Sequence, residues 1–185
     1  MNITDLENDY MLKHDLAFYL PPVIESDYLE EFAVKLSYTR KIALEKPIRL
    51  YCRCSGGAAE AGIAITNLII RDGNVNGILI GESCSMGSVI WASCAKRFVY
   101  PRTLIGVHEV AWQGADVSYN TSKLHAMWQE FDAIDRRCCE ILAAASNCDY
   151  GWWWEFYHQN GDIKWLDAAQ LVSMGMATPV ERVQI

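Results

Sequence analysis

The join between an apolar segment and a helix-like segment, at residues 81–88, constrains this chain most strongly. Residues 75–80 have the apolar character of a buried strand, and residues 86–96 are predicted to form a helix. The small residues around Ser85 allow a sharp turn that exposes its hydroxyl, as in a nucleophile elbow. A helix start also supplies free N–H groups and the positive end of the dipole, which stabilise an oxyanion. The same octapeptide alone also fits an ordinary N-cap serine.

Two other predicted strand ends carry residues that suit a catalytic site. Residues 48–53 read as a buried strand that leads into Gly56 and Gly57, and adjacent glycines permit positive φ and close approach of backbone amides. Residues 103–107 read as a short strand that ends at His108. Each feature alone is common in structural loops. Because the ends of parallel strands meet at one edge of a sheet, the glycine pair, the serine and the histidine together predict a catalytic site.

Strands and helices alternate along the chain with no linker, repeat or low-complexity segment, which predicts an α/β fold with a mostly parallel sheet. A first strand is expected at 16–20, and helices at 27–44, 59–70, 120–145 and 150–159. The helix at 27–44 is amphipathic, and its predicted core-facing residues are Leu29, Phe32, Leu36 and Tyr38. The helix at 120–145 is too long for a compact domain and carries an apolar stripe of Leu124, Met127, Trp128, Phe131 and Ile134.

Several segments match the pattern of one known family. Residues 51–57, Tyr-Cys-Arg-Cys-Ser-Gly-Gly, stand where that family has a strand followed by Asn-Ser-Pro-Gly-Gly, and residues 61–65 resemble its Ala-Gly-Met-Ala-Ile. Residues 83–88, Ser-Cys-Ser-Met-Gly-Ser, match its Ala-Ala-Ser-Met-Gly-Ala. Residues 95–98, then Pro101 and His108, match the run to its catalytic histidine. The chain resembles, from about Asp15 to its C-terminus, the ClpP family of self-compartmentalised serine peptidases.

The resemblance implies a site that hydrolyses amides through an acyl-enzyme and needs no metal or organic cofactor. Ser85 would be the nucleophile and His108 the general base and then acid. The residues expected to assist them are Gly57 and Met86, whose amides would hold the oxyanion, and Asn160 or Asp162, which would orient His108.

The orienting residue has two candidates. In the family an aspartate precedes a Phe/Trp-Leu pair, which here is Trp165-Leu166. Counting from the preceding helix favours Asn160, whereas chemical type favours Asp162, and both also fit a plain Asn-Gly turn with polar flanks. A catalytically weakened or inactive subunit of a ClpP-like ring is therefore the alternative function. A hydratase-like member of the same superfold has no support, because it would not need the serine and histidine.

The resemblance also implies the architecture and partners. We expect one ClpP/crotonase-like domain over residues 1–185, a spiral of β-α units with a projecting handle helix. The head would comprise 15–110 and 146–185, the handle 111–145, and 1–14 a short N-terminal segment. Residues 167–173 and 177–183 resemble the family's last helix and strand. Heptameric rings, stacked as a tetradecamer, would take peptides or unfolded proteins and dock an AAA+ unfoldase.

Four departures from the family pattern bear on these expectations. Ser55 replaces the proline before the glycine pair, and Glu109 and Val110 replace Gln-Pro after the histidine. Arg49 replaces an aromatic residue of the unfoldase-docking patch, in which Tyr51 is retained. The segment before Asp15 is shorter than usual, which bears on the axial loops that gate substrate entry. The ring contact and the unfoldase contact are therefore the parts expected to differ.

Composition narrows the function classes further. The 185 residues are 51% hydrophobic, enough for one core, and the net charge of −7 argues against a general nucleic-acid-binding surface. Residues 1–5 carry no basic stretch or long apolar run, so we expect a cytoplasmic protein without a membrane span. The seven cysteines are odd in number and lack paired Cys-x-x-Cys motifs, which predicts reduced, mostly buried thiols and no zinc site.

Overall fold

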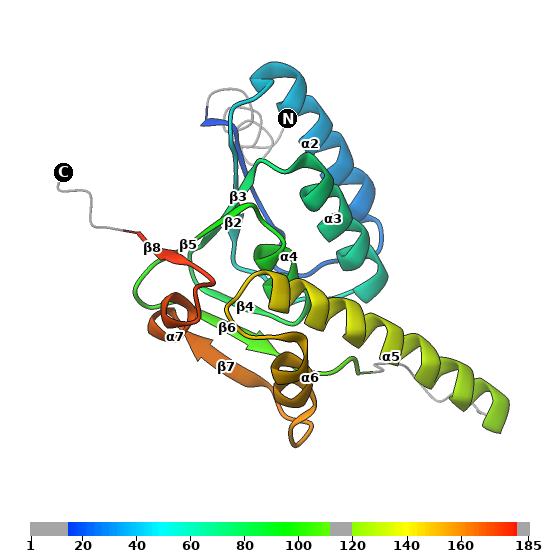
Figure 1. Ribbon diagram of the computed structural model, residues 1–185. Helices are drawn as coiled ribbons and strands as arrows, with labels where there is room; N and C mark the ends of the chain where they lie inside the picture. The colour runs from blue at the N-terminus through cyan, green and yellow to red at the C-terminus, as the bar shows by residue number, and fades with distance from the viewer. Residues whose placement is uncertain (1–14, 112–119, 181–185) are drawn as a thin grey trace.

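Parallel β-α units build the larger of two sheets in the computed structural model, which describes residues 15–111 and 120–180 (Figure 1). This five-stranded sheet has the order β1-β2-β3-β5-β8, and every neighbouring pair is parallel. Its strands are β1 (Ala17–Tyr19), β2 (Ile48–Cys52), β3 (Val75–Leu79), β5 (Lys96–Val99) and β8 (Thr178–Pro179). The expected mostly parallel α/β fold is confirmed.

A smaller sheet lies beside the first and carries the strands that lead to Ser85 and His108 (Figure 1). It contains β4 (Glu82–Cys84), β6 (Leu104–Val107) and β7 (Lys164–Asp167), in the order β4-β6-β7. The β4 and β6 strands are parallel, whereas β6 and β7 are antiparallel. Sequence patterns did not reveal β4, β5 or β7, because strands of three or four residues with polar members are too short to show a period of two.

The predicted helices are present, and one of them is shorter than expected. They are α2 (Tyr28–Ala43), α3 (Ala59–Asp72), α4 (Met86–Ala92), α5 (Thr121–Ala144), α6 (Tyr150–His158) and α7 (Ala168–Ser173). The prediction of a helix through residue 96 was wrong. The amide of Ala95 donates to the Val75 carbonyl at 2.8 Å, which starts β5 along β3 and leaves no residues for further turns of α4.

The core lies between α2, α3 and the larger sheet, and it continues under α4, α5 and α6. Phe18 and Phe32 meet edge to face, with ring centroids 5.4 Å apart. The inward prediction for Tyr38 was wrong, because its side chain is 38% exposed. Thr39, one position further round the helix, is buried instead. The Trp152–Trp154 run spreads over more than one face of α6, with Trp153 fully buried and Trp152 exposed.

The long helix α5 projects away from the body of the fold (Figure 1). Its C-terminal half is anchored in the core through Ile134, Cys138, Cys139 and Leu142. Its N-terminal half is exposed, and Leu124 and Trp128 are 53% and 62% accessible. Of the predicted apolar stripe, Ile134 is buried, Met127 and Phe131 are partly buried, and Leu124 and Trp128 are exposed.

All seven cysteines are free in the structure, and five of them are buried, as predicted for most of the thiols. Across residues 15–111 and 120–180, no helix combines the length and apolarity that crossing a membrane requires. The predictions for 1–14, and for the end of the strand expected at 177–183, lie outside the described residues.

Candidate functional site

The three strand ends singled out in the sequence border one cavity of about 860 Å³. Its walls come from the loop after β2, the start of α4, the segment after β6, and the helices α5 and α6. The predicted site residues that line it are Gly57, Ser85, Met86 and His108. The fold therefore brings these four residues together, as predicted, but the expectation that their strands share one sheet edge was wrong, because β2 lies in the larger sheet and β4 and β6 lie in the smaller one. Asn160 and Asp162 do not line the cavity.

Ser85 occupies a strained backbone conformation at the start of α4. Its φ of 54° and ψ of −130° lie in a region that residues with a side chain rarely adopt. The turn is held because the Ser85 amide donates to the Gly106 carbonyl at 2.8 Å, while the Ser85 carbonyl accepts from Ser88 at 3.0 Å. The Ser85 side chain makes no cap hydrogen bond to the helix, which is the opposite of an N-cap serine. Its hydroxyl instead lies at the cavity wall.

Small residues make room for this turn. A Cβ atom placed on Gly56 would lie 2.6 Å from the Ser85 Cβ, and one placed on Gly87 would collide with the Cys54 carbonyl oxygen. The Ser88 hydroxyl donates to the carbonyls of Ser83, at 2.8 Å, and Gly106, at 3.0 Å. Glycine at 56 and 87 is therefore required by space, and the hydroxyl of Ser88 ties the elbow to both neighbouring strands.

The glycine loop after β2 is fixed by a short stretch of parallel pairing. Gly56 and Gly57 have φ of 98° and 140°. Ile24 donates to the Gly56 carbonyl and Ala58 donates to the Ile24 carbonyl, both at 2.7 Å. Ser55 donates to the Pro22 carbonyl through both its amide and its hydroxyl, at 2.8 Å each. These bonds stiffen the loop where the resembling family has proline. Among the described residues, neither the Gly57 nor the Met86 amide has a protein acceptor, so both can donate into the cavity.

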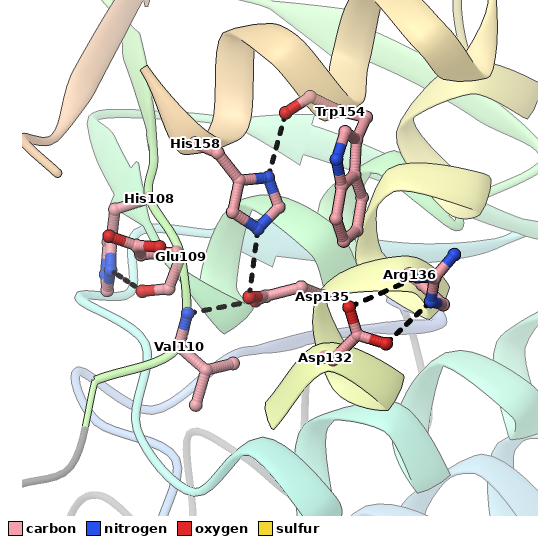
Figure 2. Close-up of polar contacts among 8 residues, drawn as sticks. All are labelled: His108, Glu109, Val110, Asp132, Asp135, Arg136, Trp154 and His158. Atoms are coloured by element: carbon pink, nitrogen blue, oxygen red, sulfur yellow. Dashed lines mark hydrogen bonds and ion pairs between the residues drawn. The ribbon is translucent and has the colours of Figure 1, made fainter. Parts of the chain in front are cut away.

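His108 follows the last residue of β6, and its ring reaches the same cavity. The Nδ1 atom lies 2.6 Å from the Glu109 carbonyl oxygen (Figure 2). Because a carbonyl oxygen only accepts hydrogen bonds, Nδ1 carries a hydrogen there. In the neutral ring, Nε2 then has a free lone pair, which is the form that accepts a proton from a hydroxyl.

A strained serine, a histidine whose Nδ1 faces a carbonyl oxygen, and two cavity-lining residues whose amides have no acceptor in the described part of the chain are the parts that a serine hydrolase site would need. A family model described as Clp protease matches residues 5–182. The chain belongs to the Clp protease family. The match covers nearly the whole chain and confirms the resemblance found in the sequence.

In this Clp-family chain the residues proposed to orient His108 lie on an exposed turn. Asn160 and Gly161 have φ of 62° and 67°, and both Asn160 and Asp162 are exposed. The β6–β7 register pairs Val107 with Lys164, so the turn before Lys164 runs beside the segment after Val107. A Cβ on Gly161 would lie 3.6 Å from a Glu109 carboxylate oxygen. The turn is thus adjacent to the base, but neither candidate hydrogen-bonds to His108 within the described residues.

Two residues near the site escaped the sequence interpretation. Asp135 is 5% exposed and accepts a hydrogen bond from the Val110 amide at 2.9 Å. Its other oxygen lies 3.3 Å from Nε2 of His158. Asp135 and His158 are far apart in the sequence and form no recognisable motif. The available signal was an aspartate within the buried face of the long helix, beside Ile134 and Cys138.

Cys84, next to the serine, is a poor alternative nucleophile. A Cβ on Gly106 would lie 2.8 Å from the Cys84 sulfur, so the thiol packs against the neighbouring strand, as expected. Burial raises the pKa of the Cys84 thiol, which reduces the thiolate fraction at neutral pH. Of these two neighbouring side chains, the Ser85 hydroxyl is therefore the better candidate nucleophile.

Replacing Gly56 should disable the elbow. In Gly56→Ala the new methyl group would meet the Ser85 Cβ and demand a φ that alanine resists, so the hydroxyl would move. We expect the rate of Ser85 labelling by a fluorophosphonate probe, read by intact mass, to fall by about 100-fold. Gly81→Ala is the matched control, because its methyl group would meet only the mobile Arg53 side chain. Equal labelling of parent and Gly56→Ala would contradict this reading of the turn.

Proposed function

We propose that this chain is a serine endopeptidase subunit that hydrolyses peptides or unfolded proteins. The observation that carries the proposal is the strained Ser85 turn, which opens on the same cavity as His108 and the amides of Gly57 and Met86. Family membership supports peptidase chemistry. The cavity is large enough for several residues of an extended peptide.

The proposed reaction uses these groups in turn. His108 takes the proton of the Ser85 hydroxyl through Nε2 while the oxygen attacks the peptide carbonyl. The carbonyl becomes an oxyanion, which the Gly57 and Met86 amides stabilise by hydrogen bonds. His108 then gives the proton to the leaving amine as the C–N bond breaks. A water molecule, activated in the same way, hydrolyses the acyl-enzyme and regenerates Ser85.

The proposed working form is a ring of subunits, heptameric and stacked in pairs, in which the catalytic sites face an enclosed chamber. Family membership and the exposed outer half of α5, with Leu124 and Trp128, support it. A projecting helix with bare apolar residues is stabilised when a second subunit covers it. Division of the chain into a head and a handle at residues 111–145 is part of the same proposal.

An AAA+ unfoldase is the proposed partner, although its docking patch is altered. Tyr51 stacks on Tyr19 with ring centroids 5.0 Å apart, which keeps an aromatic surface at β1 and β2. Arg49, two residues before Tyr51 on β2, donates to the Asp15 carbonyl at 2.6 Å and forms an ion pair with that residue. The side chain that replaces an aromatic residue is thus held against its own chain, beside the tyrosine pair.

A weakened or inactive structural subunit is the second candidate. Asn160 and Asp162 favour it, because both are exposed and His108 instead bonds to a backbone carbonyl. A carbonyl fixes the tautomer of His108 but stabilises the imidazolium less than a carboxylate does.

Substitution of the nucleophile separates the two candidates. Ser85→Ala should abolish both fluorophosphonate labelling and peptide cleavage while light scattering shows an unchanged assembly. Ser93→Ala is the control, because Ser93 ends α4 and its hydroxyl only donates to the Ile90 carbonyl. Labelling that persists in Ser85→Ala would refute the proposed nucleophile. A parent protein that neither labels nor cleaves would establish the structural-subunit alternative.

The two orienting candidates predict opposite mutational patterns. If Asp162 swings in to orient His108 during catalysis, Asp162→Ala should lower the kcat for a fluorogenic peptide by about 10⁴-fold, and Asn160→Ala should have little effect. If Asn160 has this role, the order reverses and Asn160→Asp should raise kcat. Small, equal effects of both alanine variants would show that His108 works without either of them.

Charges on the outer half of α5 should dissociate the ring. Leu124 and Trp128 lie four residues apart on the exposed part of the helix and outside the cavity. The double variant Leu124→Glu, Trp128→Glu should lower the mass measured by light scattering, because buried carboxylates would lack partners. Val34→Glu, at a 68% exposed position of α2, should keep the parental mass. A parent that is monomeric at micromolar concentration would refute the ring.

A further inference from the structure

A buried carboxylate holds the backbone just after the histidine of the site. Asp135 of α5 is 5% exposed, and its Oδ1 accepts a hydrogen bond from the Val110 amide at 2.9 Å. Figure 2 shows the other side of the same carboxyl group facing His158 of α6, with Oδ2 3.3 Å from Nε2. The His158 Nδ1 lies 2.8 Å from the Trp154 carbonyl oxygen. One side chain thus connects α5, α6 and the segment that follows β6.

The Asp135–His158 contact requires a proton. Both ring nitrogens of His158 face oxygen atoms that accept, so Nδ1 carries a hydrogen and a second proton lies between Nε2 and Oδ2. Burial raises the pKa of Asp135, and the Val110 amide and His158 oppose that effect. The Asp135 carboxyl group therefore uses its two oxygens for the contacts with Val110 and His158, and its burial leaves little access to water.

The hydrogen bond between Asp135 and the Val110 amide matters because the chain beyond the end of β6 is no longer paired with β7. The β6–β7 ladder ends at the Val107–Lys164 pair. His108 is the next residue, and its ring bonds to the carbonyl of its own neighbour Glu109. Within the described residues, the Val110–Asp135 hydrogen bond is the next fixed point of this backbone. The backbone at His108 is thus held on one side by the end of β6 and on the other by the hydrogen bond from Val110 to Asp135.

The same pair also borders the cavity wall. Ile134 and Tyr157, the residues before Asp135 and His158, line the cavity together with His108 and Val110. A shift of Asp135 would therefore move the base relative to the wall against which a substrate lies. Displacements on the scale of an ångström are enough to lower catalytic rates strongly.

We propose that Asp135, braced by His158, is a positioning residue that sets the orientation of His108 through the Val110 amide. The inference rests on the proposed serine peptidase function. Asn160 and Asp162 are exposed and poorly placed to orient His108. The proposal assigns part of this orienting role to Asp135 on the long helix. Asp135 does not touch the reacting atoms, and its effect passes through the backbone of residues 108–110.

Asparagine and alanine variants distinguish this role. Asp135→Asn keeps an oxygen for the Val110 amide, and its NH₂ group donates to Nε2 of a neutral His158, so both contacts survive. Asp135→Ala removes both. Asp132→Ala is the matched control, because Asp132 lies one turn away and forms an exposed ion pair with Arg136 (Figure 2). Fluorophosphonate labelling rates, kcat and KM for a fluorogenic peptide, and thermal melting would be measured for all four proteins.

We expect Asp135→Ala to lower the labelling rate and kcat by about 10- to 100-fold with a smaller change in KM. Asp135→Asn should recover most of that loss, and Asp132→Ala should stay within about twofold of the parent. A folded Asp135→Ala that labels at the parental rate would overturn the proposal, because a purely structural role would produce that result. So would an asparagine variant as slow as the alanine variant.

Hydrogen exchange provides a test that needs no activity and no destabilised variant. The Val110 amide of the parent, and of Asp135→Asn, should exchange slowly, and unprotected exchange in the parent would overturn the proposal even if Asp135→Ala fails to fold. The two hypotheses fail separately. A parent that does not label refutes the proposed function, whereas a parent that labels but has an unprotected Val110 amide refutes the role of Asp135.

Discussion

The strained turn at Ser85 is the constraint on which the rest of the site depends. A residue with a side chain at φ 54° is unfavourable by itself, so the surroundings must hold it. The bond from its amide to Gly106 comes from β6, and the space for its Cβ comes from Gly56 in the loop after β2. These contacts form only when β2, β4 and β6 are in their native positions relative to one another. The conformation of the serine is therefore a product of both sheets.

His108 depends on a different set of elements. The β6 strand delivers it to the cavity, but the backbone beyond it is held by α5 through Asp135, and α5 is braced by α6 through His158. Ser85, the proposed nucleophile, thus depends on the sheets, and His108, the proposed base, depends on the junction of a sheet with two helices. Since α5 also carries the exposed apolar surface proposed for assembly, a subunit contact on its outer half would act on the helix that binds the backbone after His108.

Two departures from the family pattern, Ser55 and Val110, can be explained by the hydrogen bonds that these residues form. Ser55 lacks the rigidity of proline, yet its amide and hydroxyl both bind the Pro22 carbonyl and fix the loop by hydrogen bonds. Val110 differs from proline in having an N–H group, and that N–H is the donor to Asp135. A proline at this position would leave the buried carboxylate with one partner fewer. Residues 110 and 135 are therefore matched to each other in this chain.

The sequence by itself determined the α/β class and the main helices, because apolar periodicity is a local property. It also indicated that Gly57, Ser85 and His108 converge, but the tertiary structure decided that they do so from two sheets, with β2 in one and β4 and β6 in the other. Short strands such as β4 and β7 were missed, since three or four residues carry too little pattern. Only the tertiary structure decided that Tyr38 faces solvent and that Asp135 binds the Val110 amide. Asp135 reaches Val110 through the packing of a helix against a strand end, and no spacing along the chain encodes that distance.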